Sequence, residues 1–300
     1  MSRVTALACG LATVDVVQTV ERVPSADEKV VALSTRVEAG GPALNAATTA
    51  ALLGAPCRLV TAVGAGPLAS VVREDCESAG VELVDVAGDE FELPVATVLL
   101  TRSTGDRAVV SRGALGANAG DAPPALPVAA LLQGIEAVLV DGHHLGVAVR
   151  LAAAARACGI PVLLDAGSWK PGLPALLESV DVLLASAAFR SPTGGSPADL
   201  LALGPTWVAR SAGSGSVGWA AHDGSSGSVE VPAVEVVDTL GAGDVLHGAM
   251  LAELARHGLA DLPRALERAV AVATRSVQAP GARGWAAALG RSSSSAPAPP

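Results

Sequence analysis

A loop of small residues late in the chain runs directly into a stretch with helical spacing. The loop reads Asp-Thr-Leu-Gly-Ala-Gly-Asp over 238–244, and apolar residues recur after it with the period of a helix. The first amides of a helix have no partner within it, and with the positive end of the helix dipole they attract an anion. Asp244 stands at that start. It either caps the helix or accepts a proton from a hydroxyl group that attacks a phosphoryl group held there.

A glycine pair precedes a second predicted helix. Gly40 and Gly41 come just before a run of alanine, leucine and threonine, and Asn45 lies about one turn inside that run. Asp15 follows the first apolar run of the chain. Carboxylate and amide side chains can hold the hydroxyl groups of a ligand, because both accept hydrogen bonds and the amide also donates them. The alternatives are that Asp15 begins a turn and that Asn45 is a satisfied polar group inside its helix.

Two adjacent histidines, His143 and His144, follow a predicted strand. They lie at its carboxyl end, where open α/β sheets bind their ligands. Neighbouring side chains point in different directions, so we expect at most one of the two to face a ligand. A zinc site is not expected, because zinc needs three or four ligands and no third ligand lies at a suitable spacing.

Several strands and helices must end close together to position these residues. Apolar runs of strand length alternate with helical stretches rich in alanine and leucine. Gly54, Gly80 and Gly159 follow three of these stretches, where a left-handed conformation favours glycine. The alternation predicts an α/β fold with a mostly parallel sheet covered on both faces. The predicted strands are Val4–Gly10, Arg58–Val63, Ala137–Asp141, Pro161–Asp165, Val182–Ala185 and Thr206–Arg210.

Two segments interrupt this alternation, Val14–Val37 and Phe91–Arg112. Each is rich in strand-forming residues without an intervening helix and carries charged residues, so together they predict a small antiparallel sheet that projects from the main body. Ser216–Val237 predicts a β-hairpin with its turn at Asp223 and Gly224. The serine- and proline-rich tail, residues 291–300, is predicted to be disordered, which leaves a single domain over 1–290.

The composition excludes several classes of function. A net charge of −9 and only two lysines argue against binding to nucleic acid or to an anionic membrane surface. The four cysteines are scattered, as in a reduced intracellular protein. The N-terminus has no signal-peptide pattern, and no apolar run reaches the length of about 20 residues that spans a bilayer. We therefore expect a soluble, cytoplasmic protein.

The two glycine-rich segments together resemble the paired signatures of the PfkB/ribokinase family of carbohydrate kinases. The resemblance extends to about residue 290. It implies a ribokinase-like fold, in which a mostly parallel central sheet has helices on both faces and a small β-sheet forms a lid. It also implies an ATP-dependent kinase that phosphorylates a hydroxyl group of a sugar or sugar-like substrate. In that family the later loop supplies the general base, here Asp244, and the anion hole, here Gly241, Ala242 and Gly243.

The resemblance further assigns binding residues. For the sugar it indicates Asp15, Gly40, Gly41 and Asn45, to which His143 is added from its place at the carboxyl end of a strand. For the nucleotide it indicates Ser186, Ser211, Gly213 and Gly215. The implied cofactors are ATP and Mg²⁺, with K⁺ held in part by the carbonyl group of Asp238. The implied partners are the sugar and a second copy of the chain, which would form a homodimer through the lid; neither nucleic acid nor a membrane is expected.

Some positions depart from the family pattern. The family usually carries Asn-x-x-Glu after a mid-chain strand, where it organises Mg²⁺ and the phosphates, whereas this chain has Ser186 and Phe189. A weak affinity for Mg²⁺ follows as an expectation. Segments 165–170, 180–189 and 238–248 look most like the sulfofructose-kinase branch. That branch binds its sulfonate with an arginine where this chain has His143, so the sugar is left unnamed.

Other functions remain to be weighed. A non-catalytic sugar- or nucleotide-binding relative is favoured by Ser186 and Phe189. A nucleoside kinase of the same fold is a further alternative, which the shortage of aromatic residues for stacking a base disfavours. A dinucleotide-dependent reductase would need GxGxxG after the first strand, and the turn there lacks it. A P-loop enzyme would need a lysine in GxxxxGK[ST], and neither lysine lies in that context.

Overall fold

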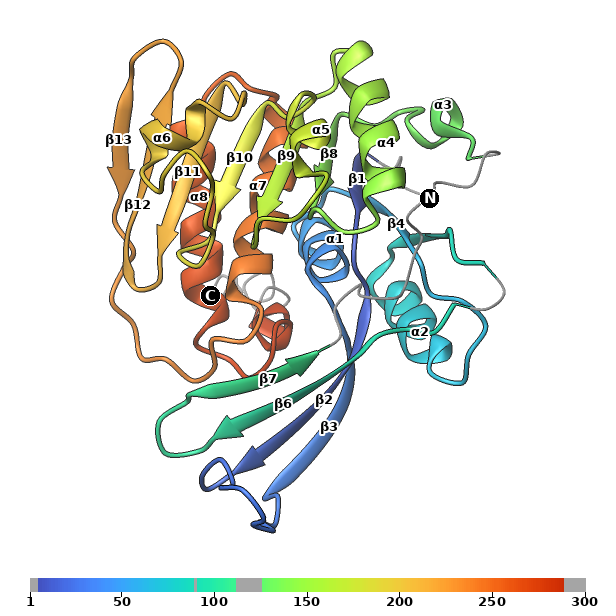
Figure 1. Cartoon of the computed structure of the whole chain (residues 1–300), viewed down its shortest axis with the longest axis vertical. Helices are drawn as coiled ribbons and strands as arrows, with labels where there is room; N and C mark the ends of the chain where they lie inside the picture. Colours follow the sequence, from blue (N-terminus) through green and yellow to red (C-terminus); the bar gives the residue numbers. More distant parts are fainter. Residues whose placement is uncertain (1–4, 89–90, 112–125, 289–300) are drawn as a thin grey trace, which may run out of the picture.

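A computed structural model describes residues 5–88, 91–111 and 126–288, and it alternates strands and helices through most of that length (Figure 1). The tail over 291–300, Val4 and Arg112 lie outside the described residues. The strands of the larger sheet are β1 (Ala6–Cys9), β4 (Cys57–Thr61), β5 (Glu82–Asp85), β8 (Ala137–Val140), β9 (Val162–Ala166), β10 (Val182–Ala185), β11 (Trp207–Ala212), β12 (Gly215–Ala221) and β13 (Ser226–Val229). The helices are α1 (Pro42–Leu52), α2 (Ala69–Ala79), α3 (Val128–Leu131), α4 (Leu145–Ala157), α5 (Leu173–Leu177), α6 (Pro197–Leu201), α7 (Ala242–His257), α8 (Leu262–Ser276) and the 3₁₀ helix η1 (Gly284–Ala288).

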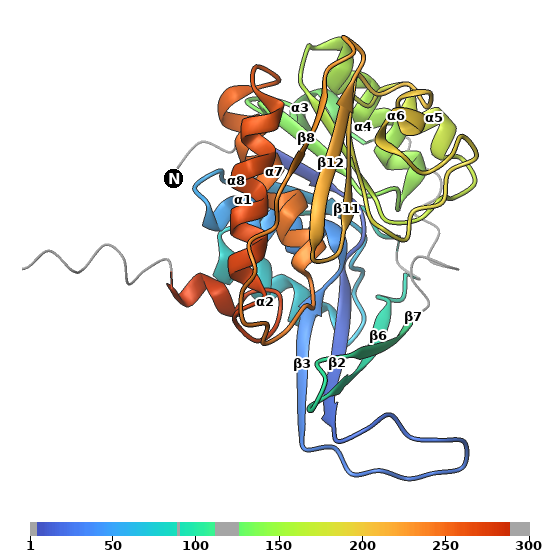
Figure 2. The same ribbon diagram turned by 90° about the vertical axis from the view of Figure 1, so that its left-hand side faces the viewer.

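The larger sheet has nine strands in the order β13-β12-β11-β10-β9-β8-β1-β4-β5. All pairs from β11 to β5 are parallel, and β12 and β13 add an antiparallel edge. Successive strand residues alternate between two cores, one with α1, α2, α7 and α8 and the other with α3 to α6 (Figure 2). The predicted α/β fold with helices on both faces is therefore confirmed. The two strands of the predicted hairpin end at Val229, so residues 230–237 add no strand.

The two interrupting segments form a separate sheet, as predicted. Its strands are β2 (Thr13–Val20), β3 (Ser34–Gly40), β6 (Val95–Thr101) and β7 (Arg107–Ser111), in the order β3-β2-β6-β7. This sheet projects from the main body (Figures 1 and 2). The expectation of a wholly antiparallel sheet is wrong in one pair, because β2 and β6 are parallel. Both strands run outward from the main body, since the chain returns to it after β3 and leaves it again at β6.

Close packing of α1 against α7 brings the two glycine-rich segments together. Gly248 on α7 lies directly against the backbone of Ala46 and the side chain of Thr49 on α1. A Cβ atom at position 248 would overlap the carbonyl oxygen of Ala46, so only glycine permits this approach. One turn earlier on α7, Asp244 consequently faces Asn45. Within the described part of the chain, no helix is long and apolar enough to cross a membrane.

Candidate active site

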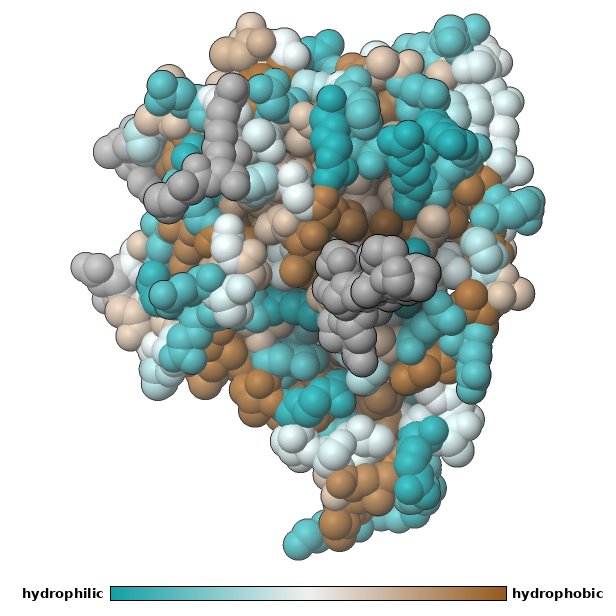
Figure 3. Space-filling view, turned by 180° about the vertical axis from the view of Figure 1, so that it is seen from behind, coloured by the Kyte–Doolittle hydropathy of each residue, from teal (hydrophilic) through white to brown (hydrophobic). Residues whose placement is uncertain are grey.

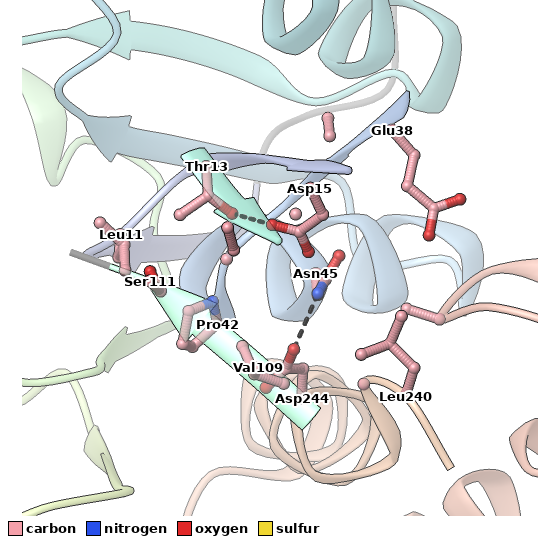
Figure 4. Close-up of a pocket in the computed structure, with 16 residues that line it drawn as sticks. Leu11, Thr13, Asp15, Glu38, Pro42, Asn45, Val109, Ser111, Leu240 and Asp244 are labelled. Atoms are coloured by element: carbon pink, nitrogen blue, oxygen red, sulfur yellow. Dashed lines mark hydrogen bonds between the residues drawn. The ribbon is translucent and has the colours of Figure 1, made fainter. Parts of the chain in front are cut away.

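A cavity of about 200 Å³ lies between the projecting sheet and the starts of α1 and α7 (Figure 4). The projecting sheet therefore forms one wall of a site whose other walls come from the main body. The lining residues are Leu11, Thr13, Asp15, Glu38, Ala39, Gly40, Gly41, Pro42, Asn45, Ala96, Val109, Ser111, Leu240, Gly241, Asp244 and Ala282. Among them are the predicted sugar-binding residues Asp15, Gly40, Gly41 and Asn45, and the predicted base Asp244.

Asp244 does not cap its helix. The N-cap residue of α7 is Gly241, with a φ of 73°, and Asp244 lies within the first turn without a side-chain capping bond. Its Oδ2 instead accepts a hydrogen bond of 2.7 Å from Nδ2 of Asn45, which the dashed line in Figure 4 marks. This geometry does not support the capping alternative. The carboxylate is directed towards the cavity and α1.

Burial holds the pKa of Asp244 well above that of an ordinary carboxyl group. The pKa rises from 3.8 to about 7, chiefly because the carboxylate is desolvated and next because the carboxyl group of Asp165 repels its charge. The hydrogen bond from Asn45 and the nearby His247 act in the opposite direction, and Asp141 adds a smaller upward influence. A carboxyl group with a pKa near 7 can gain and lose a proton at neutral pH, which suits general-base chemistry.

A buried carboxyl–imidazole pair lies beneath Asp244 and was not predicted. Nε2 of His247 lies 3.3 Å from the carbonyl oxygen of Leu184, and Nδ1 lies 3.2 Å from Oδ2 of Asp165. Because a carbonyl group only accepts, a hydrogen bond to Leu184 requires the proton on Nε2. Burial, with a smaller contribution from Asp141, raises the pKa of Asp165 to about 8. Burial lowers the pKa of His247, which keeps the imidazole neutral.

Backbone amides at the start of α7 form a candidate anion site. The N–H of Ala242 donates to the carbonyl oxygen of Thr239 at 3.3 Å, whereas the N–H groups of Gly241 and Gly243 have no backbone acceptor among the described residues. These two amides, with the helix dipole, offer positions for an anion. Asp238 fixes the loop from below, because its carboxylate accepts from the N–H of Leu240 at 2.8 Å and from that of Gly281 at 2.9 Å.

The opposite wall of the cavity carries two more carboxylates. Asp15 on β2 accepts a hydrogen bond of 2.7 Å from the hydroxyl group of Thr13, and burial raises its pKa. Glu38 on β3 lies at the mouth, beside Asp15 in the strand register. A ligand in this cavity would thus meet three acidic side chains, which favours hydroxyl groups that donate hydrogen bonds.

The other predicted site residues do not line this cavity. The backbone N–H of His143 donates to Oδ1 of Asp141, and the buried ring of His144 lies 6.4 Å from that of Phe91. Ser186 follows β10, where its hydroxyl group donates to the carbonyl oxygen of Gly167 at 3.2 Å. Ser211 lies at the end of β11, and the turn from β11 to β12 contains Gly213 and Gly215. These positions lie at or after the ends of β8, β10 and β11, which together with β9 are consecutive in the larger sheet, and none of them is among the residues that line the cavity.

Phe189 is part of the hydrophobic core. Its side chain is fully buried, and its ring centroid lies 6.1 Å from that of Trp169. Phe189 therefore fills space within the core. Among the described residues, no group of three or more histidines, cysteines or acidic residues is arranged to hold a metal ion.

Several residues that line the site were not predicted from the sequence. Thr13 and Glu38 could have been found, because each lies two positions from another lining residue on a strand, and such residues share a face. Val109 and Ser111 share a face of β7 for the same reason. Arg107, on that strand, donates to both the carbonyl and hydroxyl oxygens of Thr239 at 2.9 Å, which joins the small sheet to the loop before α7.

Comparisons with known proteins agree with this architecture. The pfkB family carbohydrate kinase model matches residues 5–287. This chain belongs to the pfkB family. It is accordingly an ATP-dependent carbohydrate kinase. A ribokinase of Arabidopsis thaliana is 28% identical over 262 residues, which cover 80% of this chain and 68% of the relative. A ketohexokinase of Mus musculus is 29% identical over 105 residues, 35% of each chain.

Solved structures show the same fold. The ribokinase of Arabidopsis thaliana in complex with ribose and ATP superposes with a TM-score of 0.73, 22% identity and 94% of each chain covered. The ribokinase of Thermotoga maritima superposes with a TM-score of 0.76 and 20% identity, covering 96% of this chain and 99% of that one. The ribokinase-like fold predicted from the two glycine-rich segments is therefore confirmed. The resemblance to the sulfofructose-kinase branch stays a prediction.

Proposed function

We propose that this kinase transfers the γ-phosphoryl group of ATP to a hydroxyl group of a neutral sugar, with Asp244 as the general base. The observation that carries the proposal is the setting of Asp244. Its carboxylate lines the cavity, accepts a hydrogen bond from Asn45 through one oxygen only, and has a pKa of about 7. The second oxygen can accept the proton of a sugar hydroxyl group, and the hydroxyl oxygen then attacks the γ-phosphorus atom as the bond to ADP breaks. The amides of Gly241 and Gly243 stabilise the charge on the transferred group.

The size and charge of the cavity support a small neutral substrate. Its volume of about 200 Å³ is below the roughly 300–1,000 Å³ typical of sites for drug-sized ligands, so one sugar ring suits it better than a nucleoside. The carboxylates of Asp15, Glu38 and Asp244 would repel a sugar phosphate, a sugar acid or a sulfonate. Asp15, Gly40, Gly41 and Asn45 are the sugar-binding residues in this proposal, and His143 would act only at its edge.

Mg²⁺ and K⁺ complete the proposal. When bound, Mg²⁺ neutralises charge on the phosphates of ATP. Among its described residues the chain has no ready-made cluster of metal ligands, so the phosphates of ATP and water would supply most ligands of the metal. The carboxylate of Asp238 is engaged with two backbone amides, which leaves its carbonyl group for K⁺. Ser186, Ser211, Gly213 and Gly215 would contact the nucleotide.

A homodimer through the projecting sheet is part of the same proposal. This sheet and the connection between β2 and β3 expose apolar side chains, among them Val31, Val37 and Val110, and Figure 3 shows apolar residues at this surface. A second copy would cover them and pair the edge of the sheet. Light scattering at micromolar concentration should give the mass of a dimer. The free thiols of Cys9, Cys57, Cys76 and Cys158 and the need for ATP support a cytoplasmic location.

Asp244→Asn tests the role of the base. Asparagine has nearly the same shape, so the variant should keep the melting temperature and ATP affinity of the wild type. Turnover should fall by roughly 10²- to 10⁴-fold, because an amide cannot accept the hydroxyl proton. A screen of ATP consumption across ketoses, aldoses, polyols, sugar acids and nucleosides supplies the substrate, with a neutral monosaccharide as the expected hit.

Asp261→Asn is the matched control. Asp261 is a capping residue, because its side chain accepts from the N–H of Arg264 at 3.1 Å at the start of α8. Asparagine caps equally well, so this variant should keep both stability and turnover. Near-normal turnover of Asp244→Asn would remove Asp244 from the chemistry. A wild-type protein that binds ATP and sugar but phosphorylates none of the compounds would instead be a non-catalytic relative.

A further inference from the structure

An arginine from the C-terminal segment contacts the far end of the Asn45 amide. Nη2 of Arg283 donates to Oδ1 of Asn45 at 3.2 Å and to the carbonyl oxygen of Ala39 at 3.3 Å. Nη1 of the same guanidinium forms an ion pair with Asp75 on α2. Arg283 thus bridges α2 and α1, and Asn45 bridges Arg283 and Asp244. The contacts form one continuous series, Asp75–Arg283–Asn45–Asp244, which joins four separate parts of the chain.

The backbone around Arg283 is held on both sides. Two residues before it, the N–H of Gly281 donates to the buried carboxylate of Asp238 at 2.9 Å. Two residues after it, the ring of Trp285 is 2% exposed and its N–H donates to the carbonyl oxygen of Ala282 at 2.9 Å. Ala282 also packs against Gly241 at the start of α7, where a Cβ atom would overlap its side chain. The guanidinium group is therefore presented from a fixed segment.

The chemistry of the two groups sets the direction of the Asn45 amide. An amide has one end that accepts and one that donates, and a guanidinium group only donates. The contact with Arg283 requires Oδ1 of Asn45 to face the arginine, which turns Nδ2 towards Asp244. Rotated by half a turn, the amide would place its oxygen against the Asp244 carboxylate and its NH₂ against the arginine. Both of those contacts are repulsive, and Asp244 would lose its donor.

We propose that Arg283 is a positioning residue, which fixes the Asn45 amide so that Asp244 keeps one oxygen bound and the other free for the sugar hydroxyl proton. The inference rests on the proposed role of Asp244 as the base. Arg283 itself does not line the cavity. Burial raises the pKa of Asp15 and the charge of Arg283 opposes that rise, so a test must separate this influence from action through Asn45. The effect of Arg283 through Asn45 should appear in the behaviour of Asp244 and in kcat, more than in the affinity for ATP.

Arg283→Met keeps an unbranched side chain that can replace the aliphatic stem and removes the donors. We expect kcat to fall by roughly 10- to 100-fold, the scale on which a small misplacement of a reacting group is felt, with a smaller change in the KM for ATP. Arg73→Met is the matched control. Arg73 lies on the same helix as Asp75 and forms an ion pair of 2.6 Å with Asp85, away from the cavity. It should show a similar loss of stability with the turnover of the wild type.

A double variant separates action through Asn45 from independent action. If Arg283 works by orienting Asn45, then Arg283→Met added to Asn45→Ala should lower kcat little beyond Asn45→Ala alone. Multiplied losses in the double variant would show that Arg283 acts on its own and would overturn the proposal.

The ionisation of Asp244 gives a readout that does not need turnover. In ¹³C-labelled protein, assigned with Asp244→Asn, the pKa of Asp244 should rise in both Asn45→Ala and Arg283→Met. Asn45→Ala removes the donor to the carboxylate, and Arg283→Met removes the group that orients that donor. Asp165 on β9, Asp141 on β8 and His247 on α7, which also influence Asp244, remain in every variant. Arg283→Lys keeps the charge but not the two-pronged geometry, so it should show the same rise.

The outcomes of that titration are distinct. An Asp244 pKa unchanged in Arg283→Met, or wild-type behaviour in Arg283→Lys, would overturn the positioning role. The expected pKa changes in a protein that phosphorylates no sugar would leave the positioning role intact and refute the proposed function instead.

Discussion

The ionisation of Asp244 predicts an unusual pH dependence for a carboxylate base. The kinase needs Asp244 ionised, and its pKa is about 7 rather than 3.8, chiefly because of burial and next because of Asp165. Activity should therefore be lost as pH falls through 7, with kcat/KM for the sugar decreasing about tenfold per pH unit below it. At pH 5, two units below the pKa, only about 1% of the carboxyl groups are ionised. A base with an ordinary pKa would still be fully active there.

The assay is ADP release between pH 5 and 9 at constant ionic strength, with ATP and Mg²⁺ saturating at each pH. Saturation with ATP matters because the terminal phosphate group of ATP also gains a proton near pH 6. Without saturation, this protonation would add a second decrease in activity at low pH. Circular dichroism at each pH confirms that the protein remains folded. Asp244→Asn serves as the reference, because its residual activity should not show this loss of activity at low pH, which is the acid limb of the pH profile.

Three results would refute this reasoning. A wild-type acid limb below pH 5 would mean that Asp244 is ionised far more readily than its burial implies. A limb near pH 7 that persists in Asp244→Asn would belong to another group, such as His247 or the nucleotide. If kcat/KM retains the limb while the NMR titration places the Asp244 pKa elsewhere, the proton acceptor is a different residue.

Three further predictions test the surroundings of the site. Folded Asp165 keeps its proton to about pH 8 but loses it near 3.8 when unfolded, so stability falls as pH rises between these values. Asp165→Asn should therefore raise the melting temperature at pH 8 and leave it almost unchanged at pH 4, as calorimetry can measure. Phe189→Glu buries a carboxylate against Trp169, and urea unfolding should show a loss of about 3 kcal/mol or more without tighter Mg²⁺ binding. Arg107→Ala removes the contact with Thr239, and the KM for the sugar should rise about 2- to 10-fold in steady-state assays.

The fold could be predicted where it depends on local signals. The six predicted strands correspond to strands of the larger sheet, because buried parallel strands are short continuous apolar runs. Gly80 ends α2 in the left-handed conformation, with a φ of 68°, as its place after an amphipathic run indicates. The parallel pairing of β2 with β6 could not be predicted in this way. It joins two strands that are separated in the chain by β3, α1, β4, α2 and β5. Their direction depends on where each strand leaves the main body.

The candidate site was predicted in its residue types but not in its contacts. Asp244 and Asn45 each belong to a glycine-rich segment, yet their hydrogen bond spans 199 residues and depends on the close packing of α1 and α7. His247 was missed because it occupies an inward-facing position of a helix, where one polar residue among apolar ones is difficult to distinguish from a core position. Arg283 was missed because it stands among small residues without periodicity, and all its partners lie on other elements.

These contacts explain why Asp244 can work near neutral pH although it is deeply surrounded by protein. Burial and Asp165 raise its pKa, and alone they would favour a protonated carboxyl group that could not accept a proton. Asn45 and His247 act against that rise, and Arg283 determines which end of the Asn45 amide is available. The pKa of Asp244 therefore depends on two opposing sets of influences. Burial and Asp165 on β9 raise it, whereas His247 on α7 and Asn45 on α1, which contacts Arg283 of the C-terminal segment, lower it. A change in either set should move the acid limb without any change to Asp244 itself.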